Sequence, residues 1–188
     1  MNELWDIRAA HWIKPCCKPG HLLLMETAGK EHEAITELIT QWVLRGTFYL
    51  ISGDEWLPDH DTLRYSVHRH TVAVDETLDN LILARPSTCL QLLDLLMEAD
   101  KQNKPILVLD FLHHFYNTDV ELSLRDHILE QCCQYTRRLS LSHPVAVLVP
   151  CLPTEEYRRF FPILASVADE IIPAQENTGA EDSQDFLF

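Results

Sequence analysis

The chain has 188 residues, 46% of them hydrophobic, so it can bury one sizeable core but is short for two. Its formal net charge of −14, with only 15 Lys and Arg, argues against tight autonomous binding to nucleic acid. No apolar run approaches the roughly 18 residues that cross a bilayer, and residues 1–15 do not resemble a secretion signal. We therefore expect an intracellular, non-membrane protein with reduced cysteines.

The first 20 residues form a separate segment that precedes the first expected strand. Its apolar side chains are Leu4, Trp5, Ile7, Trp12 and Ile13. These side chains could cover the sheet of the same chain or dock onto a neighbouring subunit. Trp5 and Trp12 are therefore candidate partner-binding residues.

Short, nearly uniformly apolar runs alternate with helical patterns over residues 21–172. We expect strands at residues 21–25, 47–51, 80–84, 105–109, 144–149 and 170–172. We expect one helix at residues 31–45 and a second that begins after an N-cap at Ser87. A third is expected at residues 123–140, and a fourth runs from Thr154 to a break or kink at Pro162. Cys132 falls on the apolar stripe of the third helix and is expected in the core. The pattern predicts an α/β domain with a mostly parallel sheet between two layers of helices.

The sequence LLLMETAGKE, residues 22–31, runs from the first strand into the first helix, as a phosphate-binding loop would. The working loop is G-x-x-x-x-G-K-[ST], in which backbone amides and the lysine hold phosphate and the hydroxyl holds magnesium. Gly29 and Lys30 match this pattern, whereas Leu24 replaces the first glycine and Glu31 replaces the hydroxyl residue. The loop is therefore degenerate, and no cofactor is expected; residual ATP and Mg²⁺ binding through Gly29, Lys30 and Asp110 is the alternative.

Asp110 ends the apolar strand in PILVLDFL, residues 105–112, as does the acidic residue that organises magnesium in nucleotide sites. LDNLILARP (78–86), PILVLDFLHHFYNTD (105–119) and HPVAVLVP (143–150) follow one another in an order that resembles the RecA-like recombinases of the archaeal and eukaryotic type. The resemblance covers about residues 21–172 and implies a three-layer, P-loop-type core domain.

The family carries a catalytic glutamate at the end of the strand that resembles YLISGDEWLP, residues 49–58. Gly53 stands at the matching position, and Asp54 or Glu55 could replace the glutamate only if the register shifts. The loops after Asp110 and Val149, which contact DNA in the family, are short, acidic and almost free of glycine here. The resemblance therefore implies a paralogue with lost catalysis and weak or indirect DNA contact.

Other site chemistries fit the sequence less well. The pairs and triplets around His60, His68 and His113 match no recognised metal-ligand spacing, and adjacent histidines such as His113 and His114 do not easily face the same way. We expect these histidines on surface loops and no metal site. The absence of a G-x-S-x-G elbow argues against a serine hydrolase.

Residues 173–188 are polar and acidic, and we expect a flexible tail. Its last residues, 185–188, loosely resemble the acidic, aromatic-ended tip of bacterial single-stranded-DNA-binding proteins. Phe186 and Phe188 are therefore further candidate partner-binding residues.

Three functions remain open from the sequence. The first is a non-catalytic recombinase paralogue that assembles with another RecA-like or DNA-repair protein. The second is a weak ATP-binding or ATP-hydrolysing enzyme, and the third is a RecA-like regulatory protein outside DNA repair.

Overall fold

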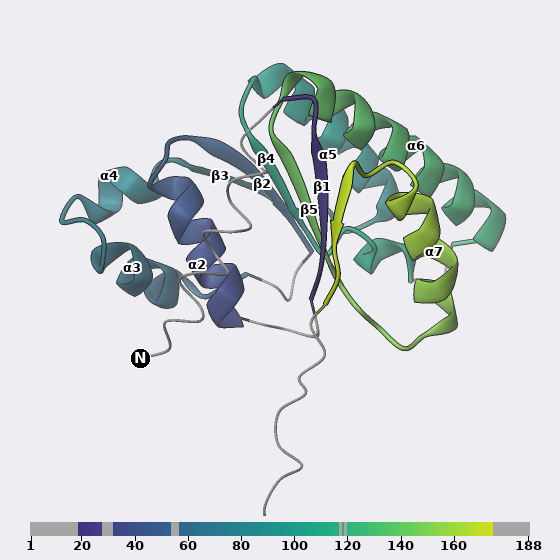
Figure 1. Ribbon diagram of the computed structural model, residues 1–188, viewed down its shortest axis with the longest axis horizontal. Coiled ribbons are helices and arrows are strands. Elements are labelled where there is room, and N and C mark those ends of the chain that lie inside the picture. Colours follow the sequence, from purple (N-terminus) through teal and green to yellow (C-terminus); the bar gives the residue numbers. More distant parts are fainter. Residues whose placement is uncertain (1–18, 28–31, 54–56, 117, 119, 175–188) are drawn as a thin grey trace, which may run out of the picture.

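The computed structural model describes residues 19–27, 32–53, 57–116, 118 and 120–174 (Figure 1). A six-stranded parallel sheet forms the centre, with strand order β3-β2-β4-β5-β1-β6. The strands are β1 (Leu22–Thr27), β2 (Phe48–Ser52), β3 (Leu81–Ala84), β4 (Ile106–Leu109), β5 (Val145–Pro150) and β6 (Glu170–Ile172). The expected mostly parallel sheet is confirmed, and each strand lies within two residues of its predicted bounds.

Helices cover both faces of the sheet, which confirms the three-layer architecture (Figure 1). One face packs against α2 (His32–Val43), α3 (His60–His68) and α4 (Val74–Leu78). The other face packs against α5 (Cys89–Gln102), α6 (Leu122–Ser142) and α7 (Glu155–Ala165). Alternate strand residues supply the two cores: Leu22 and Leu24 join the second, whereas Leu23 and Met25 join the first. Cys132 is fully buried, as expected.

Several local predictions need correction. The sequence pattern predicts no helix between β2 and β3, but this segment contains α3 and α4. The N-cap of α5 is Thr88, whose hydroxyl accepts from the Gln91 amide, and not Ser87. Pro162 does not break α7, which continues to Ala165 because the buried residues Phe160 and Leu164 hold the helix on both sides of it.

Among the described residues, no helix is both long and apolar enough to span a membrane.

The start of β6 is held to the start of β1 by the carboxylate of Asp169. Its Oδ2 accepts from the Leu22 amide at 2.7 Å and from the Arg137 guanidinium, while the Asp169 amide donates to the Leu22 carbonyl at 3.0 Å. The Leu22 hydrogen bond is the main reason that the pKa of Asp169 lies below its ordinary value, and Arg137 adds to the effect.

The lowered pKa of Asp169 predicts an acid-dependent loss of stability. The carboxylate stabilises the folded state fully above its unfolded pKa near 4, and this contribution is lost as the pH falls through the lowered folded pKa. Asp169→Asn is therefore expected to lower Tm at pH 7 and to bring it toward the wild-type Tm at about pH 2. Thermal melts between these pH values test this, with the exposed Asp79→Asn as control. A constant difference in Tm across the range would contradict the prediction.

Candidate functional site

The carboxyl ends of parallel strands meet at one edge of a sheet, and ligands of such folds bind where neighbouring strands send their chains to opposite faces. One such switch point lies between β1 and β5, because β1 leads to α2 on one face and β5 leads to α7 on the other. The candidate site is therefore the edge formed by the ends of β1, β5 and β4, with the end of β2 beside it.

β1 stays paired in the sheet at the positions where the phosphate-loop pattern begins. Leu24 is buried and pairs with Val147 of β5 on one side and Ile171 of β6 on the other. Pairing with β5 continues to Thr27, whose carbonyl accepts from the Cys151 amide at 2.8 Å. Since α2 begins at His32, only four residues connect strand and helix. Four of the eight positions of the loop pattern, residues 24–27, are thus part of the strand.

A carboxylate and a tyrosine occupy the switch point itself. Glu26, at the end of β1, accepts a hydrogen bond from the hydroxyl of Tyr157 in the first turn of α7. Tyr157 is buried, and its amide is capped by the hydroxyl of Thr154. Burial first, and then the Glu26 carboxylate, raise the pKa of Tyr157 well above its ordinary value. The phenol therefore stays protonated and donates to the Glu26 carboxylate at the ends of the strands.

Asp110, the acidic residue expected at the end of β4, lies at this edge in an unusual conformation. Its φ of 54° places a non-glycine residue in the left-handed region. Oδ2 lies 3.1 Å from Nδ1 of His113, and the Asp110 carbonyl accepts from the His113 amide at 3.0 Å. Oδ1 is buried without a hydrogen-bond partner among the described residues. Asp110 is thus a buried carboxylate that uses one of its two oxygens.

An aromatic cluster holds the turn that follows Asp110. The short 3-10 helix η2 (His113–Phe115) packs through Phe115 and the next residue, Tyr116, on Phe160 of α7, each with ring centroids 6.3 Å apart. Arg125 of α6 donates to the Phe115 carbonyl at 2.8 Å. Burial, followed by the charges of Asp110 and Glu156, raises the pKa of Tyr116. The cluster fixes Asp110 from the side of α7.

Gly53 directly follows β2 beside this turn, at the position that resembles the family's catalytic glutamate. A Cβ atom added to Gly53 would lie 3.4 Å from Cβ and Cγ of His113. A side chain at this position would therefore begin in close contact with the imidazole. His113, which pairs with Asp110, lies beside the position that resembles the family's general base.

The structure describes only part of the predicted site. Asp110 and Gly53 lie at the expected edge, but the remaining candidates lie outside the described residues: Gly29, Lys30, Glu31, Asp54, Glu55, Trp5, Trp12, Phe186 and Phe188. The expectation of surface loops needs correction, because His60 and His68 begin and end α3, and His113 and His114 are half-buried in η2. Within the described ranges, no group of three His, Cys, Asp or Glu could hold a metal ion.

Sequence reasoning did not identify the roles of Glu26, Tyr157 and Tyr116. The sequence pattern places Glu26 after the first strand rather than within it. It assigns Tyr157 only to the first turn of a helix. A charged residue directly after four buried strand residues was the available signal for Glu26.

Among the described residues, two arginine doublets, one in α6 and one in α7, are largely neutralised by carboxylates. In the doublet of α6, Arg137 pairs with Asp169, and Arg138 pairs with Asp100 at 2.9 Å. In the doublet of α7, Arg159 pairs with Asp126. Phosphate contact at these positions would have to break existing ion pairs, which argues further against a nucleic-acid interface there.

Comparison with known proteins gives no match to a family model and none to a curated protein.

Removal of the Tyr157 hydroxyl tests the closed switch point. Tyr157→Phe leaves the Glu26 carboxylate without its donor, so we expect the free energy of unfolding to fall by about 2 kcal/mol. Urea denaturation measures the loss, and Tyr135→Phe is the control because the Tyr135 ring stacks against Arg138 at 4.5 Å and its hydroxyl bonds no described residue. Equal, small losses in both variants would show that the contact contributes little.

Proposed function

We propose that the chain is a non-catalytic RecA-like paralogue that serves as a protein-interaction or assembly subunit in DNA recombination or repair. The observation that carries the proposal is the regular pairing of β1 through Thr27 at the position where a working phosphate loop begins. A strand that pairs on both sides at Leu24 has no free backbone amide there to offer a phosphate.

The charges at the carboxyl edge support the same proposal. Glu26 and Asp110 stand at the ends of β1 and β4, which are separated only by β5. Strands lie about 4.8 Å apart, so two carboxylates face the same region within roughly 10 Å. A polyphosphate would meet both, and among the described residues no lysine or arginine pairs with either of them.

The free edge of the sheet at β3 is the surface best suited to a protein partner. β3 pairs with β2 on one side only, and no described strand pairs with its other side. Its Leu83 side chain is 42% exposed. An unpaired strand edge with an exposed apolar side chain can accept a strand from another protein through backbone hydrogen bonds. The partner class that the sequence resemblance favours is another RecA-like or DNA-repair protein.

One observation favours a second candidate, a weak Mg²⁺-nucleotide site. The unpartnered Oδ1 of Asp110 is a buried acceptor, and a hydrated magnesium ion would satisfy it. This candidate requires Mg-ATP binding that depends on Lys30 and Asp110.

The assembly proposal is tested by crosslinking the full chain in its own cells and identifying the captured proteins by mass spectrometry. We expect a RecA-like or repair protein whose recovery falls at least tenfold in Leu83→Lys. Val72→Lys is the matched control, because Val72 is 95% exposed on the turn between α3 and α4. Recovery of no such protein, or equal recovery with both variants, would contradict the proposal.

A further inference from the structure

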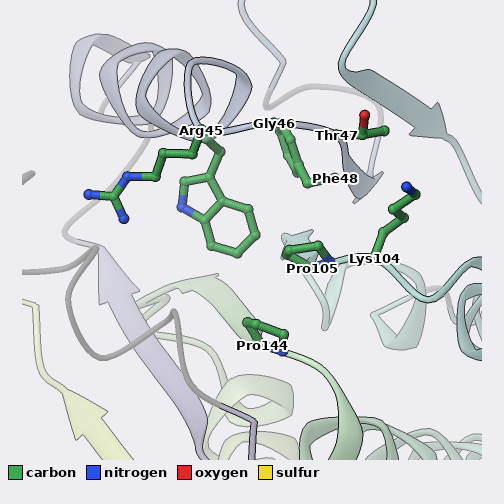
Figure 2. Close-up of a pocket in the computed structure, with 8 residues that line it drawn as sticks. Arg45, Gly46, Thr47, Phe48, Lys104, Pro105 and Pro144 are labelled. Atoms are coloured by element: carbon green, nitrogen blue, oxygen red, sulfur yellow. The ribbon is translucent and has the colours of Figure 1, made fainter.

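A pocket of about 400 Å³ lies at the opposite end of the sheet from the candidate site, where β2, β4 and β5 begin (Figure 2). The residues that line it come from the end of α2, the turn into β2 and the starts of the other two strands: Trp42, Arg45, Gly46, Thr47, Phe48, Lys104, Pro105 and Pro144. No feature of the candidate site described above extends to this end.

The floor of the pocket is apolar. Trp42 and Phe48 meet edge to face with ring centroids 5.2 Å apart, and both are buried. Pro105 and Pro144 also line the pocket, and their carbonyls accept from the amides of Tyr49 and Ile106. Trp42 Nε1 is a buried donor without an acceptor among the described residues. Such a floor favours a flat apolar or aromatic group that carries an acceptor beside it.

The rim is cationic. Arg45 and Lys104 stand on opposite sides of the apolar floor in Figure 2. Lys104 is half-buried and makes no ion pair with any described residue. Gly46, with φ of 134°, has nothing within 4 Å of an added Cβ, which leaves the mouth open between the two cations. The pocket therefore suits an aromatic side chain flanked by carboxylates.

We propose that residues 181–188 of the same chain bind this pocket, with the Phe186 ring on the floor and neighbouring carboxylates at the rim. Residues 175–188 contain Glu176, Glu181, Asp182 and Asp185, and no Lys or Arg. In a chain with a net charge of −14, a segment of this kind is repelled by most of the surface and attracted to the cationic rim of the pocket.

Residues 1–18 also lie outside the described residues and carry apolar side chains, but their charge complements the rim less well. This segment joins the described chain near the same end of the sheet and carries Trp5 and Trp12. Its charged side chains are Glu3, Asp6, Arg8, Lys14 and Lys18, so it has more cations than anions. The cationic rim therefore favours residues 181–188 over residues 1–18.

The covalent connection is long enough for binding within one molecule. Ala174 follows the carboxyl end of β6, whereas the pocket lies where β2, β4 and β5 begin. The two points are separated by about 20 Å along the strands and by three strand spacings of about 4.8 Å each, or by roughly 25 Å in a straight line. The 12 residues from 174 to Phe186 span at most about 40 Å. A covalent connection of this length gives an effective concentration near the millimolar range, so a weak site in the same molecule is largely filled.

Photo-crosslinking of the full chain tests the proposal directly. Phe186 is replaced by p-benzoylphenylalanine, the purified protein is irradiated, and crosslinked peptides are identified by mass spectrometry. We expect crosslinks within single molecules to residues 42–48 and 104–105. Lys104→Glu is expected to lower their yield at least fivefold, as is an increase in salt from about 0.05 M to 1 M, which shortens the screening length from more than 10 Å to about 3 Å.

Lys101→Glu is the matched control, because Lys101 is exposed on α5 three residues away, pairs with Glu98 and does not line the pocket. Arg45→Glu is a second rim variant in case Lys104→Glu lowers the melting temperature. Crosslinks to other surfaces, crosslinks only between two molecules, no crosslinks, or equal yields in Lys104→Glu and Lys101→Glu would each overturn the proposal.

Discussion

Leu24→Gly, which restores the first glycine of the phosphate-loop pattern, is expected to lower the free energy of unfolding by about 4 kcal/mol and to create no nucleotide binding. Leu24 is about 1% exposed in the middle of β1, between Val147 and Ile171. Truncation of a buried leucine costs about 2–5 kcal/mol, and glycine in a strand interior adds about 0.5–1 kcal/mol. The position is thus part of the core, whatever its place in the sequence pattern.

Urea denaturation measures the loss, and calorimetric titration with Mg-ATP tests for any gain in binding. Leu24→Ile is the control, because it keeps the buried volume and is expected to cost less than about 1.5 kcal/mol. A glycine variant that stays as stable as the wild type and binds nucleotide would show that β1 can open into a loop at Leu24.

Phe160→Ala is expected to lower the free energy of unfolding by about 3–5 kcal/mol and to loosen the turn that carries Asp110 and His113. Phe160 is fully buried between the rings of Phe115 and Tyr116, with the Arg125 guanidinium 5.9 Å from its ring centroid. Its removal leaves a cavity beneath η2 and removes a contact of the buried guanidinium.

Hydrogen exchange separates the two effects in this variant. The amides of Phe115 and Tyr116, which bond to Leu112 and His113, are expected to exchange faster in Phe160→Ala by more than the global loss of stability explains. Phe161→Ala is the neighbouring control, because Phe161 is only half-buried and stacks on Tyr157 at 5.0 Å. Equal exchange at the turn in both variants would mean that Phe160 does not hold η2 in place.

The strands were predictable because buried parallel strands leave a strong local signal. Residues such as Ile106 to Leu109 form a short, uniformly apolar run, and only a covered sheet buries every residue of such a run. Helix α3, which the sequence pattern did not predict, leaves only a weak local signal. Only Leu63, Ser66 and Val67 are buried in it, so its hydrophobic periodicity is too weak to stand out. Its one readable signal was the Asp59 cap, whose carboxylate accepts from the Thr62 amide at 2.8 Å.

The site was predictable only where a strand end marks it. Asp110 follows an apolar strand, so its place at the edge could be inferred, but its positive φ and its pairing with His113 could not. Glu26 and Tyr157 are 131 residues apart, and no local pattern joins them. The pocket where β2, β4 and β5 begin likewise depends on Trp42, Lys104 and Pro144, which only the strand order brings together.

Isothermal titration of the full chain with Mg-ATP tests most directly the claim that the carboxyl edge no longer binds nucleotide. The continuous pairing of β1 and the Glu26–Tyr157 contact predict no heat of binding up to millimolar nucleotide, with identical traces for the wild type and Lys30→Ala. Micromolar binding that Lys30→Ala or Asp110→Asn abolishes would contradict the claim and would identify the chain as a working nucleotide-binding protein.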